Sequence, residues 1–436
     1  MIRKSFSHTK TLVAGLAAAL LAGSAFAQFV SGSNGEDGEL LVASNMTLPL
    51  QDDGVHEYTT ITIEAGATLT ISPNANNTPV FFLASGPIVV NGTINVAGAN
   101  GLQPSNTAPS VPGNEADGGA GGYAGGLGAL PVPLGGDGIA TSGQGPGGGL
   151  ASLSIGATIG RAGNGGSHRA AGGIGSGSEQ PAAPTYGDPL LQTLRGGSGG
   201  AGSNYQATQE GTRSSGGGGG GGGAILLASS DSITIDGIVD ARGGNGGGGV
   251  FSDGGGSSGA GGGAGGAIRV VADTVSGTGQ LLASGGAAGA GTSIGGAGGN
   301  GWIRIETFAV SGTLPANSRP GPLSGAPNPV VRPGDANLPS FRIVSIGGID
   351  VPEPASGSLA APDVIFTPQT PSTVTIVIET ENIPDGAIIN LRIPLETGEV
   401  LTVSTPPVVN DGTSVDVMIP NGFGVIYGSA EFNPTR

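Results

Sequence analysis

The chain has 436 residues, of which 91 are glycine, 31 are proline and none is cysteine, and its formal net charge at pH 7 is −16. The acidic charge disfavours nucleic acids and anionic membranes as partners, because both are negatively charged themselves. The lack of cysteine excludes a disulfide-stabilised scaffold and a thiolate zinc site.

The first 27 residues have the pattern of a secretory signal peptide. A basic start at Arg3 and Lys4 precedes the apolar run Leu12–Leu21, and Ala25–Ala27 supplies the small residues of a cleavage site before Gln28. This pattern predicts export with removal of residues 1–27, and a secreted, extracellular or cell-surface location. No later apolar run reaches membrane length, so no membrane span is expected in the mature chain.

The mature chain begins with strand-like segments. Glu39–Ser44 and Tyr58–Ile71 are rich in β-branched residues and alternate apolar with polar positions. We expect them to form the cap and the first coil of a repetitive fold, because an uncapped end would invite edge-to-edge association.

One sequence repeat, which we call the phrase, then recurs along the chain: strand, turn, strand, glycine, strand and a glycine-rich exit. Its complete copy is Gly223–Gly246, with further copies in Pro79–Gly101 and Gly266–Gly286, and a fourth begins at Trp302 and fades by Leu314. Repeats of this kind stack, because one unit alone cannot bury its apolar side.

The residues within each copy indicate short strands with one buried face. Ile233 and Ile235 alternate with Thr234 and Asp236, which is the period of a strand. A glycine holds the same place before the third strand of three copies, where a tight corner leaves no room for a Cβ: Gly92, Gly237 and Gly279. No helical period separates the strands, so the pattern predicts an all-β chain built as a right-handed parallel β-helix.

Over roughly Val55 to Leu314, these phrases resemble the coils of secreted bacterial glycine-rich β-helix proteins. Those proteins share the pectin-lyase-like and autotransporter-adhesin architecture. The resemblance implies a β-helix domain over residues 28–314. It implies no particular activity, because that architecture hosts lyases, hydrolases, adhesins and inert stalks alike.

Three long glycine-rich excursions, at residues 98–222, 243–265 and 285–301, interrupt the copies. Each leaves after the third strand of one copy and returns before the first strand of the next, so all three should emerge at one corner and lie side by side. Ordering a glycine costs about 0.5–1 kcal/mol more than ordering an alanine, so ordered excursions would need compensating contacts.

Two interpretations of the excursions are open: flexible glycine–serine loops, or extended polyproline-II chains bonded backbone to backbone. Apolar anchors at Leu127–Leu134, Leu150–Ile159 and Pro189–Leu194 favour the ordered form. In composition the tracts resemble the polyglycine bundles of some phage tail adhesins and antifreeze proteins. No strict Gly-X-Y period runs through them, which excludes collagen.

The C-terminal third changes character. Seven prolines between Pro315 and Pro339 predict a stiff, extended linker over residues 315–339. Residues 340–436 then show about seven alternating strands, with turns at Pro384–Gly386 and Asn410–Gly412. This spacing predicts a small immunoglobulin-like β-sandwich without the cysteine pair of immunoglobulin domains.

Catalytic residues are hard to find. Polysaccharide cleavage needs paired carboxylates, or a basic residue beside a metal-held uronate. The copies offer Asp231, Asp236, Asp240, Asp253 and Asp273. Asp236 and Asp240 are four residues apart and should share one side of a strand, but a polar turn or an outward ladder explains them better. We therefore predict no catalytic residues.

Metal and cofactor sites are not expected either. The two mature histidines, His56 and His168, are far apart in the sequence. Glu36-Asp37 and Asp52-Asp53 could form a weak calcium site, but solvated acidic turns explain them better. The glycine tracts are not phosphate-binding loops, because no Gly-Lys-Ser/Thr follows them.

Two functions remain open. The chain is either a non-catalytic surface or extracellular protein of adhesin-like type, or a carbohydrate-active β-helix enzyme with an accessory sandwich. The missing catalytic constellation favours the first, with the glycine-rich excursions as contact surface. Polysaccharide or cell-surface components are the expected partners, with neither nucleic acid nor a cofactor.

Overall fold

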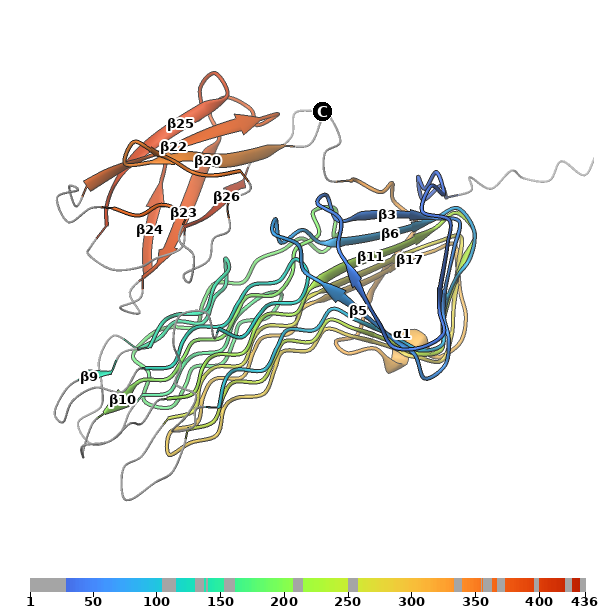
Figure 1. Ribbon diagram of the computed structural model, residues 1–436, viewed down its shortest axis with the longest axis horizontal. Helices are drawn as coiled ribbons and strands as arrows, with labels where there is room; N and C mark the ends of the chain where they lie inside the picture. The colour runs from blue at the N-terminus through green and yellow to red at the C-terminus, as the bar shows by residue number, and fades with distance from the viewer. Residues whose placement is uncertain are drawn as a thin grey trace, which may run out of the picture.

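The computed structural model describes residues 29–103, 115–129, 137–138, 140–152, 161–206, 215–249, 258–332, 339–353, 355, 363–366, 373–395, 400–419 and 426–431. The predicted signal peptide, Asp253 and the anchor residues 130–134 and 153–159 lie outside this part of the chain. The fold is almost entirely β-structure and contains three parallel sheets, followed by antiparallel sheets near the C-terminus (Figure 1).

Each of the three parallel sheets takes one strand from each successive repeat. The first sheet consists of β3 (Val55–Tyr58), β6 (Val80–Ala84), β11 (Ala224–Ser229), β14 (Ala267–Val271), β17 (Trp302–Glu306) and β19 (Leu323–Gly325). The second consists of β1 (Glu39–Val42), β4 (Thr60–Ile63), β7 (Ile88–Val90), β12 (Ser232–Ile235), β15 (Thr274–Ser276) and β18 (Ala309–Val310). The third consists of β2 (Met46–Pro49), β5 (Thr68–Ser72), β8 (Thr93–Asn95), β13 (Ile238–Asp240) and β16 (Gln280–Leu282).

The strand register confirms the alignment of the repeats. Ile225 pairs with Val80 on one side and Ile268 on the other, and Ile268 pairs with Ile303. Because consecutive strands visit the three sheets in rotation, the same position of each repeat is stacked on the next. We call this set of sheets the stack.

The stack is held by columns of aliphatic side chains on the inner faces of the sheets. In the second sheet, Ile61, Ile88, Ile233 and Val275 are paired in register and are all fully buried. Burial of one such side chain stabilises the fold by about 1.5–3 kcal/mol. The alternation in β12, where Ile233 and Ile235 are buried and Ser232 and Thr234 are not, follows from this arrangement.

The glycine predicted at the corner between the second and third sheets is required by close packing. A Cβ on Gly237 would lie 1.9 Å from the carbonyl oxygen of Gly92, and one on Gly279 would lie 2.1 Å from that of Gly237. The chain turns here with the backbones of successive repeats in direct contact, so no larger residue fits.

Residues 315–332 of the proline-rich segment lie against the stack. The segment begins in the short helix α1 (Leu314–Asn317), whose Leu314 is fully buried. Arg319 then accepts a hydrogen bond from Ala283, and β19 pairs with β17. The stiff extended chain predicted from the prolines thus lies against the stack, because an edge strand needs partners on only one side and tolerates flanking prolines.

Two antiparallel sheets follow. One has the order β21 (Ile349–Asp350), β20 (Ser340–Ile346), β22 (Thr373–Glu381) and β25 (Gly412–Met418). The other has the order β24 (Val400–Ser404), β23 (Ile388–Pro394) and β26 (Tyr427–Glu431). Ile376, Leu391 and Val417 belong to one buried cluster that draws on both sheets. We call these two sheets the antiparallel unit.

Candidate contact surface of the glycine-rich bundle

The glycine-rich excursions leave and re-enter the stack at one corner. They follow β8, β13 and β16, which are neighbours in the third sheet, and precede β11, β14 and β17, which are neighbours in the first. Figure 1 shows them running side by side away from the stack. We call the described residues of these excursions, within 96–223, 241–266 and 283–301, the bundle. At its far end, β9 (Asp137–Gly138) pairs with β10 (Tyr205–Gln206).

The bundle is ordered by backbone hydrogen bonds whose direction rotates with a period of three. Along the central chain 215–224, the amides of residues 215, 218, 221 and 224 donate to chain 120–129. Those of residues 217, 220 and 223 donate to chain 96–102, and those of residues 219 and 222 to chain 261–264. Three residues per turn is the period of a polyproline-II helix, which makes no hydrogen bonds within itself. The ordered interpretation of the excursions is therefore confirmed for the described residues.

The unbroken run Gly216–Gly223 lies where the bundle surrounds the chain. A Cβ on Gly221 would lie 1.8 Å from the carbonyl oxygen of Gly197, and one on Gly219 would lie 2.1 Å from that of Gly244. Real Cβ atoms do not approach an oxygen so closely, so the chains can be this close only because glycine has no side chain. The cost in conformational entropy is offset by these contacts.

The outermost chain has a local period of three that the sequence analysis missed. Ile294, Ala297 and Asn300 are exposed, whereas Gly296 and Gly299 are buried. An outer chain presents one residue per turn to solvent, and only that position accepts a side chain freely. The signal was present as Gly-Gly-x over residues 295–300, but it is too short to show as a repeat of the whole chain.

One side of the bundle, which we call the outer face, consists of three parallel chains. Gly98 and Gly101 donate to the carbonyls of Arg242 and Asn245, and the chain 243–249 bonds in the same way to 284–290. Unburied residues of these chains include a set at every third position: Ala97, Asn100, Gln103, Arg242, Asn245, Gly248, Ser284, Ala287 and Ala290. Several residues between them, among them Ala99 and Leu102, are also not buried. Side chains on this face thus form a grid, repeating about every 9 Å along each chain.

Two asparagine side chains accept hydrogen bonds from backbone amides of the outer face. The side-chain oxygen of Asn100 accepts from the amide of Asn245 at 2.9 Å, and that of Asn245 accepts from Ala287 at 2.8 Å. These bonds satisfy outward-pointing backbone donors and fix the rotation of both side-chain amides. The one charged residue of the face, Arg242, is paired with Asp240 at 2.6 Å. The outer face therefore carries oriented amides and little net charge.

The predicted apolar anchor Pro189–Leu194 ties the bundle to the stack. Leu191 and Leu194 are buried in a cluster with Phe81 and Leu226 on the outward side of the first sheet. Leu127, from a second predicted anchor, is buried within the bundle. These contacts explain why the bundle projects in a fixed direction.

Asp236 and Asp240 do not lie on one strand, so the prediction that they share one side of a strand is wrong. Asp236 is in the turn after β12, whereas Asp240 ends β13, and the corner at Gly237 separates them. The Asp236 carboxylate accepts hydrogen bonds from the amide and hydroxyl of Thr278 at 2.8 and 2.9 Å. Asp236 thus connects neighbouring repeats, whereas the Asp240 carboxylate accepts a hydrogen bond from the amide of Arg242 within its own repeat.

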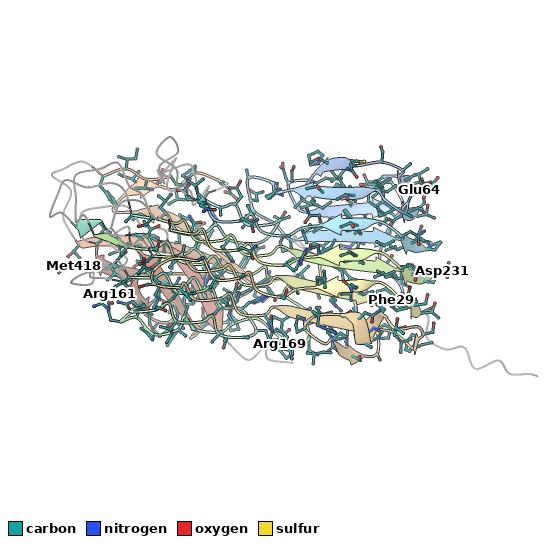
Figure 2. All side chains as sticks on the ribbon, turned by 90° about the horizontal axis from the view of Figure 1, so that it is seen from below. Phe29, Glu64, Arg161, Arg169, Asp231 and Met418 are labelled. Carbon is teal, nitrogen blue, oxygen red and sulfur yellow. The ribbon has the colours of Figure 1, made fainter. Side chains whose placement is uncertain are left out.

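Among the other acidic candidates, Asp273, Asp37 and Asp53 accept hydrogen bonds from backbone amides. Asp273 accepts from the amide of Phe29, and Asp231 is exposed at the side of the stack away from the bundle (Figure 2). Asp37 accepts from Glu57 at 2.6 Å, and Asp53 accepts from Val55 at 2.9 Å. Within the part of the chain that the structure describes, no group of three or more histidine, aspartate or glutamate side chains is arranged to hold a metal ion.

The two histidines in the described part of the chain, His56 and His168, have separate structural environments. His56 stacks on Tyr58 and meets Phe82 edge-on, and burial lowers its pKa despite the nearby carboxylates of Asp37 and Asp53. His168 is fully buried, and its Nδ1–H donates to the carbonyl of Gly265 at 2.8 Å. Burial lowers the pKa of His168 to about 4, so the ring is neutral near pH 7.

A buried ionic network on the outward side of the first sheet could not be read from the sequence. Glu306 is fully buried between Arg269 at 3.0 Å and Arg304 at 2.5 Å. Burial alone would raise the pKa of Glu306, but the hydrogen bonds from both arginines outweigh it and leave that pKa below its usual value. The network holds residues 326–332, which we call the strap: Asn328 donates to Glu306 at 2.8 Å, and Arg269 donates to the carbonyl of Asn328.

No helix among the described residues is long and apolar enough to cross a membrane. Comparison of the chain with protein-family models, with curated proteins and with solved structures finds no match.

Proposed function

We propose that the three parallel sheets form a right-handed parallel β-helix and that the antiparallel unit is an immunoglobulin-like sandwich. The rotation of consecutive strands through the three sheets and the in-register stacking of Ile225, Ile268 and Ile303 support the first assignment. Seven short antiparallel strands around one apolar cluster support the second.

We further propose that the protein is a non-catalytic, exported structural or adhesin-like protein that contacts polysaccharide or other neutral cell-surface components through the outer face. The observation that carries this proposal is the oriented amide grid on a rigid glycine scaffold. Because the oxygens of Asn100 and Asn245 are held by backbone amides, their NH2 groups are left to donate toward solvent. Neutral sugars offer hydroxyl acceptors at such a surface, and binding there costs little additional ordering.

Charge matching supports neutral over charged partners. The outer face has one charged residue, Arg242, and this side chain is neutralised by Asp240. A polyanion would gain little at such a surface, and the acidic chain as a whole would repel it.

The proposal is tested by binding to a panel of insoluble polysaccharides and to bacterial surfaces. Asn100→Asp with Asn245→Asp keeps the oxygens that cap the backbone but removes the NH2 donors, and we expect it to abolish binding seen with the parent. Asn91→Asp, at an exposed corner of the stack, is the matched control and should bind as the parent does. Undiminished binding by the double variant would refute the assignment of the surface.

The same panel tests the enzymatic alternative. Each polysaccharide is incubated with the parent and assayed for new reducing ends and for absorbance from unsaturated products. Release of either kind of product would overturn the non-catalytic proposal, and its loss in Asp236→Asn or Asp240→Asn would then return those residues to candidacy.

A further inference from the structure

An arginine of the antiparallel unit reaches into the bundle. Arg392 lies on β23, the middle strand of its sheet, and is half-buried. Its Nη1 donates to the carbonyl of Gly145 at 2.7 Å, and its Nη2 donates to the carbonyl of Gly148 at 2.9 Å. The planar guanidinium presents its donors in a fixed fork, so two carbonyls at this spacing are recognised together.

The two carbonyls belong to a turn that is itself held rigidly. Gly148 donates to the carbonyl of Gly145 at 3.0 Å, and Gly147 donates to the hydroxyl of Ser198 at 3.0 Å. Gly145 has φ +95°, and a Cβ there would lie 2.6 Å from both the Tyr123 ring and the Ser198 hydroxyl. The turn therefore accepts only glycine at this position, and its carbonyls are positioned before the arginine arrives. We call the turn 145–148 the socket.

The chain that leads to the antiparallel unit is anchored separately. The strap is bonded to the buried network through Asn328, and Arg332 pairs with Glu57 at 2.5 Å. Between the strap and β20 the chain has only residues 333–339. An extended segment of this length spans at most about 25 Å. It therefore limits the distance between the unit and the strap but does not fix the unit in one position.

We propose that Arg392 and the socket form a latch that holds the antiparallel unit in one docked position on the bundle. Without the guanidinium, the unit samples the volume that residues 333–339 allow. The socket belongs to chain 140–152. In the hydrogen-bond network, chains 196–206 and 215–223 lie between that chain and the outer face. The docked unit consequently leaves the outer face open.

The latch is tested by measuring one distance between the unit and the stack. The chain has no cysteine, so Ser414→Cys on β25 of the unit and Asn91→Cys on the stack, both exposed, can be spin-labelled uniquely. Pulsed dipolar spectroscopy should give a single narrow distance distribution in this parent. Arg392→Ala should widen it at least two-fold, and Arg392→Lys should widen it less, because one ammonium cannot reproduce the two-pronged contact.

Arg342→Ala is the matched control. Arg342 is an exposed arginine of the same unit that pairs with Glu353 and Glu379 within the unit, so its removal should leave the distribution narrow. Near-ultraviolet circular dichroism establishes whether each variant is folded. If Arg392→Ala does not fold, the width of the distance distribution in Arg392→Lys decides whether the latch exists. A distribution that stays narrow in the folded Arg392 variants, or widens equally in Arg342→Ala, would overturn the latch.

Discussion

Adjacent glycines in the centre of the bundle should respond oppositely to the same substitution. A Cβ on Gly218 would lie 1.9 Å from the carbonyl oxygen of Gly200, whereas the nearest atom to a Cβ on Gly217 is the Leu102 amide nitrogen at 3.4 Å. Both glycines are buried and both belong to the run Gly216–Gly223. Alanine at either position lowers the entropy of the unfolded chain equally, so the pair isolates the packing contribution.

The magnitude follows from the displacement that Gly218→Ala requires. Gly200 must retreat by roughly 1 Å, and its carbonyl accepts a hydrogen bond from Gly126 at 2.8 Å that would be strained. Overpacking of this kind costs about 1–3 kcal/mol, and a weakened hydrogen bond adds about 0.5–1.5 kcal/mol. The lower entropy of the unfolded chain returns about 0.4–1 kcal/mol. We therefore expect Gly218→Ala to destabilise the protein by about 2–3 kcal/mol and Gly217→Ala to stabilise it by about 0.4–1 kcal/mol.

Urea unfolding monitored by circular dichroism measures both variants against the parent. Gly321→Ala is a second control, because a Cβ there meets nothing within 4 Å, and it should be neutral or slightly stabilising. Hydrogen exchange gives an independent measurement, since amides of the central chain should be protected in the parent. Equal midpoints for Gly217→Ala and Gly218→Ala, or exchange at the unfolded rate over residues 215–223, would refute the close-packed bundle.

Four further predictions concern the stack, its ionisable groups and export. Ile233→Ala should lower the free energy of unfolding by about 2–5 kcal/mol in a denaturant titration, because the side chain is fully buried in the second sheet. Glu306→Gln should cost about 3–5 kcal/mol in the same assay, because Arg269 would remain buried without its counter-charge; an unchanged midpoint would contradict the network. For His168, the folded pKa of about 4 lies below the ordinary histidine pKa of 6.5, so the unfolded state binds more protons between these values. Stability should therefore fall as pH drops through that window, by up to about 3 kcal/mol. Unfolding measured at several pH values should show a flatter pH dependence of stability in His168→Asn than in the parent. N-terminal sequencing of exported protein should begin at Gln28, and a retained Met1 would contradict the predicted signal peptide.

Much of the stack could be predicted from the sequence because its signals are local and repeat. The alternation around Ile233 and Ile235 depends only on strand period, and the pairing of Ile225 with Ile268 follows from aligning two copies of one phrase. The common exit of the excursions follows from the same alignment. Glycine at the corner position, Gly237, was predictable because three successive corners, at Gly92, Gly237 and Gly279, make the same demand on the backbone.

The tertiary structure decided what depends on contacts between distant segments. Gly217 and Gly218 are indistinguishable in the sequence, and only the neighbouring chains determine which of them excludes a Cβ. The proline-rich segment was predicted as a stiff, extended linker, and its attachment to the stack at Asn328 depends on Glu306, a residue that no local pattern connects with it. Asp240 was expected beside Asp236, but the corner between them directs it to Arg242 instead. Sequence periodicity reports the direction of a side chain within its own element, whereas its partner is set by which elements the fold brings alongside.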